Sequence, residues 1–460
     1  MFLNMRVYTS YIIILLFLSS CKVTKTYVKP EINTDSLFRT DLMEDTASIS
    51  HLAWSELYTD SALQRLIEEG LNNNPELEVA YMNIQKTEAY YKQSRSAYFP
   101  DLELFADVEV SHIPEDQRTT GGSNRTLYSA GLMSAWEADV WGKLKSSKRA
   151  EWANVLATTE AAKAIKTRLI ATIAIYYYQL LAMDEQLEIT EKTIENWRNT
   201  VVVMQELKEA ATVTEAAVVQ SEAQQYAAEV TIPDLKQAIR ETENALAILL
   251  GRSHETIRRS EMKQQQLPDS LQAGVPSQLL ANRPDVFQAE LQFRRQFELS
   301  NVARTYFYPS LSIGGTAGFS TQKLNTFFNP ASFLANIGAG LTQSVFNKRL
   351  NKTRLEIALL EEEEAFVNFK VALLEAGKEV SDALSLYEMS GEKINIRRKQ
   401  VSSLEKAAEY TQELLENGFA NYTEVITARQ SLLQAELGSV NDRLERLISV
   451  VNLYRALGGG

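Results

Sequence analysis

The ten residues DLELFADVEV at positions 101–110 decide the fold of this chain. Their side chains alternate between two sets: Leu102 and Leu104 belong to an apolar set, whereas Glu103 and Asp107 belong to a mainly acidic one. A period of two is typical of a β-strand, because successive side chains of a strand point to opposite faces. The stretch therefore predicts a strand with one apolar and one acidic side.

Three further segments predict strands of similar length. In residues 310–319, Leu311 and Ile313 alternate with serine, glycine and threonine, and residues 333–343 and 125–136 alternate in the same manner. We expect two hairpins, and strands of about ten residues can cross a bilayer when they are tilted. The predicted hairpins cover about 101–136 and 310–346, with polar connections at 114–124 and 321–330.

The two hairpins belong to two tandem copies of one unit. Motifs around Pro75 and Pro284 match at an offset of 209 residues, as do motifs around Pro100 and Pro309. Later matches keep the same order at offsets of 205 and 207 residues, so the offset changes only where loops tolerate a few extra residues. The predicted divisions are a signal peptide at 1–20, an N-terminal segment and equatorial region at 21–73, and repeat 1 at 74–251. An equatorial linker at 252–283 and repeat 2 at 284–458 follow.

Most of the remaining sequence predicts unusually long helices. Apolar residues at 169–204 follow alternating spacings of four and three, interrupted only by Thr190, and residues 355–387 repeat the pattern with Glu362 as the exception. This spacing predicts coiled-coil packing along a seam. The predicted helices cover 143–207 and 348–416, about 100 Å each at 1.5 Å per residue, and they return as shorter helices at 214–250 and 422–457.

Two shorter helices complete the predicted elements. They cover 75–97 and 284–306 and open with Pro75 and Pro284, because proline is favoured in the first turn of a helix. The segments left over, 22–73 and 252–283, are polar and are predicted to be irregular and to wrap the middle of the molecule. The fold class is therefore mainly α with a membrane β part.

Composition excludes several classes of function. The net charge of −12 argues against a nucleic-acid partner, which requires a basic surface. One cysteine and three scattered histidines exclude an intramolecular disulfide and a Cys/His metal cluster. The acidic run at 361–364 predicts a solvated helix face, since four adjacent helical side chains point in different directions. No catalytic set or phosphate loop can be assembled, so we expect neither an enzyme nor a bound cofactor or metal.

The N-terminus predicts export from the cytoplasm. Arg6 precedes an apolar run at 11–18, and small residues follow it, which is the order of a secretory signal. The run is too short to span a bilayer as a helix. The sequence LSSC at 18–21 resembles a bacterial lipobox, which implies cleavage after residue 20 and acylation of Cys21. The alternative is an ordinary signal peptide with an incidental cysteine.

Several motifs together resemble the TolC-type outer-membrane efflux proteins. They are WEADVWGKL at 136–144, NALAILLG at 244–251, GVPSQLLANRPDVFQAE at 274–290 and YRALGGG at 454–460. The similarity covers essentially the whole mature chain and is strongest to the lipoprotein branch that serves resistance-nodulation-division (RND) pumps. It implies a homotrimer with a twelve-stranded β-barrel in the outer membrane of a Gram-negative bacterium. A periplasmic α-helical barrel, a periplasmic adaptor and an inner-membrane RND transporter are implied as well.

Physical reasoning from the strands also predicts oligomerisation. Unpaired strand edges cannot lie in lipid, where only a closed barrel satisfies every backbone group. The strands of one chain are too few to close around a pore. The acidic side of residues 101–110 can then face a water-filled lumen.

The resemblance also implies functional positions at the turns of the long helices. Glu424 matches one acidic position of the periplasmic gate, whereas Thr427 stands where the family has a second acid. A ring of three Glu424 carboxylates would attract cations, and the alternative is a solvated carboxylate in the first turn of a helix. Ala211 and Gly418, at the turns, are the predicted contacts for the adaptor.

Two tryptophans lie where strand is predicted to become helix. Trp136 and Trp141 are predicted to form part of an interfacial aromatic belt, and packing at the strand-to-helix joint is the alternative. Asp139 and Lys143 are candidates for tying this joint together, through a salt bridge.

The favoured function is a passive exit duct for small molecules delivered by an RND transporter through the adaptor. Two alternatives remain: the duct of a type I protein secretion system, and a lipid-anchored periplasmic scaffold without a pore. The scaffold predicts helices without amphipathic strands, so the alternation at 101–110 and 310–319 argues against it.

Overall fold

The computed structural model describes residues 23–32, 37, 52–112, 124–265 and 282–459. The predicted signal peptide and Cys21 lie outside this part of the chain, as do most of one polar connection and much of the predicted linker. The chain forms two compact units. The first contains the described parts of Met1–Glu31 together with Ile84–Thr158 and Ala289–Phe369, and the second contains those of Ile32–Asn83, Thr159–Gln288 and Lys370–Gly460.

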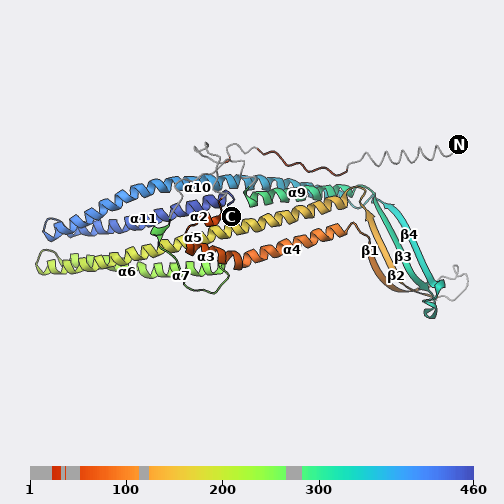
Figure 1. Cartoon of the computed structure of the whole chain (residues 1–460), viewed down its shortest axis with the longest axis horizontal. Helices are drawn as coiled ribbons and strands as arrows, with labels where there is room; N and C mark the ends of the chain where they lie inside the picture. The colour runs from red at the N-terminus through yellow and green to blue at the C-terminus, as the bar shows by residue number, and fades with distance from the viewer. Residues whose placement is uncertain (1–22, 33–36, 38–51, 113–123, 266–281, 460) are drawn as a thin grey trace. The chain divides into compact units, whose positions relative to one another are not determined.

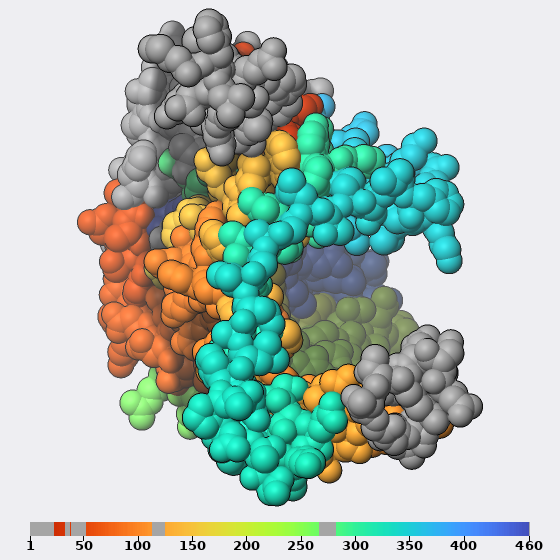
Figure 2. Space-filling model, turned by 90° about the vertical axis from the view of Figure 1, so that its right-hand side faces the viewer, coloured from red at the N-terminus to blue at the C-terminus, as the bar shows by residue number. Residues whose placement is uncertain are grey.

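The first unit contains the predicted strands as one antiparallel sheet (Figure 1). The strands are β1 (Asp101–His112), β2 (Asn124–Ala138), β3 (Ser310–Thr321) and β4 (Phe333–Thr342), in the spatial order β1-β2-β3-β4. The β1–β2 and β3–β4 pairs are the predicted hairpins, and the β2–β3 pair joins the two halves of the chain. In Figure 2, the teal and cyan residues of the β3–β4 hairpin face the viewer. Within the described residues, β1 and β4 each leave one edge unpaired.

The pairing register gives the sheet one apolar and one polar face. Leu104 lies opposite Leu132, Leu132 opposite Ala317, and Ala317 opposite Ala335. The apolar side chains thus form one continuous surface across all four strands, where Leu104 is 81% and Ile337 84% exposed. The opposite face carries the acids of β1 beside serine, threonine and glycine residues of the other strands. The predicted two-sided strands are confirmed.

Two helices of 67 residues each, α5 (Lys143–Glu209) and α10 (Leu350–Glu416), confirm the predicted long helices. In the second unit their predicted seam is buried, and Ile173 and Leu180 of α5 and Val380 of α10 are 0% exposed. In the first unit the seam residue Leu359 is 40% exposed, so the chain alone leaves that part uncovered. No helix among the described residues combines the length and the apolar character needed to cross a membrane.

The two return helices differ from each other. α11 (Tyr422–Ala456) is continuous, close to its prediction. The prediction of one helix at 214–250 is wrong, because Val230 separates α6 (Glu215–Glu229) from α7 (Thr231–Leu249). Pro233 explains the break: proline has no N–H to donate to the carbonyl group four residues earlier, and its ring crowds that carbonyl.

The shorter helices include two that the sequence did not predict. α4 (Pro75–Ser96) and α9 (Pro284–Thr305) begin at the expected prolines. The irregular segment predicted at 22–73 is wrong in its last part, which forms α2 (Trp54–Leu57) and α3 (Ser61–Asn73). Asp60 caps α3 by accepting a hydrogen bond from the Ala62 N–H at 2.8 Å. The described residues also form three short 3-10 helices: η3 (Met262–Gln264), η5 (Leu324–Thr326) and η6 (Pro330–Ser332).

A half-buried carboxylate joins part of the predicted linker to α3 and α5 within the second unit. The Asp60 carboxylate accepts hydrogen bonds from the Tyr177 hydroxyl at 2.5 Å, from the Gln265 amide at 2.8 Å and from the Ser260 hydroxyl. Burial alone raises the pKa of Asp60, but the hydrogen bonds from Ser260, Tyr177 and Gln265 together lower it below its usual value. The start of α3, the middle of α5 and the segment before residue 266 are therefore held at one point.

Two glycines make the same close backbone contact, one in each half of the chain. Gly251 and Gly458 have φ angles of +66° and +82°. A Cβ atom would lie 2.2 Å from the Asn73 carbonyl oxygen at Gly251 and 2.4 Å from the Asn282 carbonyl oxygen at Gly458. The glycines are 207 residues apart and the asparagines 209. This recurrence supports the interpretation of the chain as two copies of one unit.

Replacing either glycine by alanine should destabilise the second unit. Gly251→Ala and Gly458→Ala each add left-handed strain of about 1–2 kcal/mol and overpacking of about 1–3 kcal/mol against a carbonyl oxygen that cannot rotate away. We expect a clear fall in the midpoint of thermal unfolding of the purified protein, measured by circular dichroism.

Gly418→Ala is the matched control. Gly418 also has a positive φ of +75°, but nothing lies within 4 Å of a Cβ atom there. This variant should therefore show only the left-handed strain, and all three share the same change in unfolded-chain entropy. Equal losses in the three variants would contradict the role given to the carbonyl contacts.

Candidate functional site at the helix tips

Each long helix turns at its tip through one residue in the left-handed conformation. Ala211 follows α5 with a φ of +57°, and Gly418 follows α10 with a φ of +75°. Each turn is closed by an N–H that donates back to the helix: Thr212 donates to the Leu207 carbonyl at 2.8 Å, and the equivalent bond after Gly418 is 2.7 Å. The predicted contact residues thus occupy equivalent positions, and both are exposed.

A small apolar cluster joins the two tips. Met204, Val218, Leu415 and Val425 are buried together, one from each of α5, α6, α10 and α11. The turns beyond this cluster are open, and the Phe419 side chain is 82% exposed. The four helix ends therefore share one core, whereas the side chains of the turns are exposed.

The two predicted gate residues lie just beyond the second turn. Asn421 caps α11 by accepting a hydrogen bond from the Thr423 N–H at 3.2 Å, which places Glu424 in the exposed first turn. Thr427, one turn further on, donates its hydroxyl to the Thr423 carbonyl at 2.8 Å. Glu424 therefore offers a charge at the tip, while the Thr427 hydroxyl is bonded within its own helix.

The sequence analysis missed an arginine that bridges three helices above the tips. From α11, Arg429 donates through Nη1 to the Asn196 carbonyl of α5 at 3.1 Å and through Nη2 to Gln412 Oε1 of α10 at 3.3 Å. Its Nε atom is buried without a partner among the described residues. Burial lowers the pKa of the Arg429 guanidinium, and Glu416 opposes this effect. The apolar positions of Val425 and Ile426, one turn earlier, were the available signal that this residue faces inward.

An acidic cavity of about 370 Å³ lies beside this arginine, between α5, α10 and α11. Lys192 and Arg429 are the cations of its lining. Burial raises the pKa of Glu436, Lys192 lowers it and Glu405 raises it again, so the net pKa lies above the usual value. The acids of the lining are Glu405, Glu409, Glu413, Glu416 and Glu436. Negative charge thus accumulates directly behind the tips.

The joint between strand and helix is tied differently from the prediction. The expected Asp139–Lys143 salt bridge is wrong: Asp139 instead caps α5 by accepting from the Leu144 and Lys145 N–H groups, both at 2.9 Å. Lys143 pairs with Glu137 at 2.8 Å. An exposed helix start lacks partners for its first N–H groups, so a carboxylate is better used there than in an exposed ion pair.

The two tryptophans also bond at this joint. The Trp136 indole N–H donates to the Tyr98 carbonyl at 3.0 Å, and the Trp141 indole N–H donates to the Pro309 carbonyl at 2.6 Å. Both indoles therefore fix the strand-to-helix connections, and a place at the membrane interface stays a prediction. Within the described residues, no three His, Cys, Asp or Glu side chains are placed to hold a metal ion.

Comparison with known proteins places this architecture in a family. The pattern of the family described as "Outer membrane efflux protein" matches residues 66–252 and 275–459. The "Cation efflux system protein CusC" of Escherichia coli O6:H1 is 27% identical over 456 residues, covering 97% of each chain. The "Solvent efflux pump outer membrane protein SrpC" of Pseudomonas putida is 28% identical over 407 residues, covering 88% of this chain and 87% of that protein.

Solved structures agree with these matches. The outer-membrane channel OprN superimposes with a TM-score of 0.88 at 23% identity, over 96% of this chain and 99% of that one. This likeness concerns the fold alone, whereas the two family matches span both halves of the sequence. The chain belongs to the outer membrane efflux protein family.

Proposed function

We propose that this outer membrane efflux protein is the passive exit duct of a tripartite efflux system. Three copies would join their four-stranded sheets into a twelve-stranded barrel, and the long helices would continue it as a tunnel through the periplasm. The observation that carries the proposal is the sheet, with one exposed apolar face, one polar face and two edges without a partner in the described residues.

The sheet gives a physical reason for closure. In hydrocarbon an unpaired backbone N–H or C=O group costs several kcal/mol, so open edges are not tolerated there. Pairing β4 of one copy with β1 of the next removes every edge at once. The apolar face then meets lipid, and the acids of β1 face water. A scaffold without a pore gives no reason for such a sheet.

The helices support the same assembly. On α10, Leu360, Val367 and Leu374 are 61%, 50% and 63% exposed and lie seven residues apart. Heptad spacing of apolar residues is the pattern of a coiled-coil seam. This row is separate from the seam that α10 buries within the chain, so it is available for packing against a neighbouring copy.

The tips are where the partners of the duct would bind. Ala211 and Gly418 are exposed at the two turns, and Phe419 adds a large apolar side chain beside Gly418. We assign these turns to a periplasmic adaptor that connects the duct to an inner-membrane RND transporter. Energy and choice of cargo belong to that transporter, so the duct passes small molecules without selecting them.

Two features would hold the duct in the outer membrane of a Gram-negative bacterium. The barrel is the main one, and an acylated Cys21 is the second. Trp136 and Trp141 would then lie near the level of the headgroups, where aromatic side chains are favoured. Their hydrogen bonds to Tyr98 and Pro309 keep them at the strand-to-helix joint.

The gate would combine the charge of Glu424 with the bridge made by Arg429. In a trimer the three Glu424 carboxylates would form a ring near the axis. Because Thr427 stands where the family has a second acid, each chain contributes one carboxylate to this ring rather than two. Arg429 joins the inner helix α11 to α5 and α10, and so resists separation of the helices. Opening then requires these two hydrogen bonds to break, after which the cavity acids repel one another.

Glu424→Ala should change conduction through the gate. In the proposed gate the three Glu424 side chains narrow the closed opening, so their removal should widen it and single-channel conductance of the trimer in a planar bilayer should rise. Glu388→Ala, an exposed acid far along α10, should leave conductance unchanged. Unchanged conductance in Glu424→Ala would favour a solvated carboxylate, and a trimer without any conducting steps, even with loosened tips, would refute the duct.

Arg429→Ala should open the tips more strongly than Glu424→Ala. It removes the two hydrogen bonds that Arg429 makes to α5 and α10, and a hydrogen bond to a charged group contributes about 1.5–3 kcal/mol. We expect a larger open fraction in single-channel records and faster hydrogen exchange in the tip turns. Arg429→Lys should restore one bond at most, and Arg398→Ala, an exposed arginine of α10, is the control. Tips as closed as in the unsubstituted protein would exclude Arg429 from the gate.

Leu104→Arg should hinder insertion into the outer membrane. An arginine facing lipid near the middle of the bilayer costs about 2–4 kcal/mol per chain. Glu103→Arg, the neighbour on the polar face, should insert normally because it faces water. The measurement is the fraction of each variant recovered from outer membranes as trimer after a urea wash, and equal recovery would show that the two faces are assigned in reverse.

A further inference from the structure

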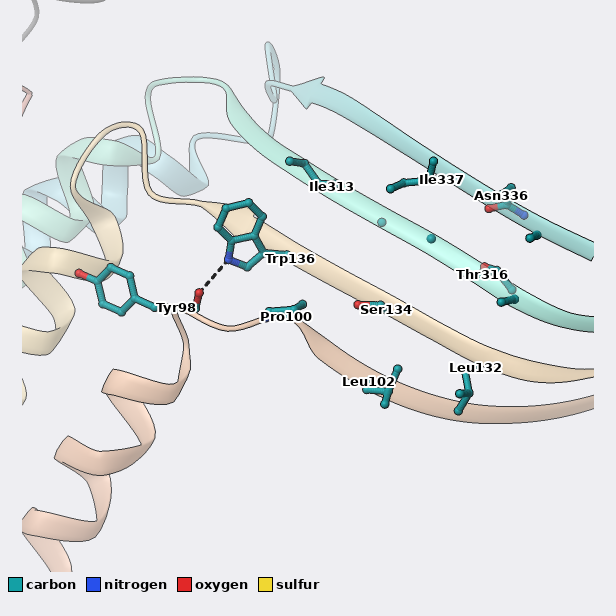
Figure 3. A pocket seen from close by; sticks show the side chains of 14 residues that line it. Tyr98, Pro100, Leu102, Leu132, Ser134, Trp136, Ile313, Thr316, Asn336 and Ile337 are labelled. Atoms are coloured by element: carbon teal, nitrogen blue, oxygen red, sulfur yellow. Dashed lines mark hydrogen bonds between the residues drawn. The ribbon is translucent and has the colours of Figure 1, made fainter.

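The apolar face of the sheet is hollowed at the end nearest the helices (Figure 3). The open hollow measures about 780 Å³. Its shape follows from side-chain size: the lining contains the small residues Gly315, Ala317 and Ala335 beside larger ones. The register places Ala317 opposite both Leu132 and Ala335, and Gly315 opposite Ile337. Leu132 and Ile337 therefore stand as walls beside a floor of small residues.

The end of the hollow toward the helices is fixed by an indole ring. Figure 3 shows Trp136 and Tyr98 at this end, with Leu102, Ile313 and Ile337 along the strands. The Trp136 N–H is already bonded to the Tyr98 carbonyl at 3.0 Å. The ring therefore has no donor left for a polar ligand and bounds the hollow as an apolar wall. Ser134, Thr316 and Asn336 add polar atoms to the lining, but most of it is apolar. Hydrocarbon is therefore the chemistry that it accepts best.

The N-terminal segment is fastened along α9. The Asn301 side chain, 0% exposed, accepts from the Lys25 N–H at 2.8 Å and donates to the Lys25 carbonyl at 3.0 Å. The Tyr27 ring packs against Phe297 with centroids 5.5 Å apart, and Lys29 pairs with Glu290 at 2.7 Å. Lys25 thus meets the late part of α9 and Lys29 its early part. The segment runs antiparallel to α9, so its earlier residues point toward the sheet.

The first fastened residues lie at the strand-to-helix joint. A Cβ atom on Gly142 would come within 3.3 Å of Thr24. Trp141, the preceding residue, bonds to the Pro309 carbonyl next to β3, which lines the hollow. Gly142 itself lies six residues after Trp136, the wall of the hollow. The fastened segment therefore ends at the same joint as the hollow.

The remaining length of chain is short. Cys21 precedes Thr24 by three residues, and three extended residues reach at most about 11 Å. A fatty acyl chain spans about half of the 30 Å hydrocarbon core, or about 15 Å more. Because contacts at residues 24–29 already hold this segment in place, a tethered chain loses little further freedom when it binds.

We propose that the acyl chains of Cys21 lie in this hollow on the chain's own sheet. The inference rests on the proposed acylation of Cys21 and goes beyond it, since it assigns the lipid a fixed binding place between Leu132, Ile313 and Ile337. Lipidation would then fasten the outer face of the barrel to the N-terminal segment, in addition to its contact with the bilayer.

The test uses photocrosslinking in intact outer membranes. Cells take up a fatty acid that carries a diazirine, the membranes are irradiated, and the full-length protein is purified and digested. Mild alkali removes ester-linked chains, so only the amide-linked chain still joins the Cys21 peptide to the peptide that it labelled. We expect that peptide to come from β2, β3 or β4 at the hollow, and Cys21→Ser to give no such product.

Substitutions that fill the hollow provide the decisive comparison. Ala317→Phe and, from the facing strand, Ala335→Phe should reduce the joined product to background. Ala106→Phe puts the same ring on the same face outside the hollow and should leave the product unchanged. It also shows whether an added ring permits insertion.

Two results would overturn the inference. Labelling of the hollow by fatty acid without the Cys21 peptide would mean that bulk phospholipid fills it. Joined products that persist in both filled variants would place the acyl chain elsewhere. An intact mass without acyl groups would overturn both this inference and the lipid anchor, while conducting trimers would still support the duct.

Discussion

The sheet's backbone is the constraint on which the rest of the structure depends. In hydrocarbon every N–H and C=O group must find a partner, and one chain leaves two strand edges without any among its described residues. An arrangement with an exposed apolar face and open edges is stable neither in water nor in lipid. The oligomer is thus part of the fold of the sheet, and the apolar rows left exposed on the helices are consistent with the same requirement.

The long helices bury very different amounts of apolar surface along their length. Near the middle, the seam of α5 and α10 is buried against a large core, with residues such as Ile173 and Val380 at 0% exposure. At the tips a far smaller cluster around Met204 and Val425 holds four helix ends together. The free energy of separating helices scales with the apolar area they bury, so the tips are the easiest part to open.

Most of the fold could be predicted from regular patterns of apolar residues in the sequence. Alternation in residues 101–110 defined a strand, and spacings of four and three defined α5 and α10, because both patterns repeat over many residues. α3 was missed because it is short and because its segment is polar overall. The apolar stripe formed by Leu63 and Ile67 is therefore not obvious in the sequence. The break at Val230 depends on the single residue Pro233. The helical pattern on both sides of it is long, so the sequence analysis predicted one continuous helix there.

Contacts between distant residues were the least predictable part of the candidate site. Two acidic residues, Glu137 and Asp139, shortly precede Lys143 in the sequence. Only the position of the helix start shows that Asp139 is used as a cap and Glu137 as the ion-pair partner. Arg429 gave no signal of its own, because its partners are a backbone carbonyl on α5 and an amide on α10, which spacing within α11 cannot identify.

Duplication makes the differences between the two halves informative. The tips match at an offset of 207 residues, as Ala211 and Gly418 show, so Glu424 corresponds to Ala217 and Arg429 to Glu222. The first half therefore has an alanine where the second has the acid at the tip, and an acid where the second has the bridging arginine. The backbone of the two turns is alike. The two hairpins therefore differ at these positions in their side chains. The gate proposed at Glu424 and Arg429 is then a property of the second hairpin, while the first hairpin supplies the Asn196 carbonyl that accepts the Arg429 hydrogen bond.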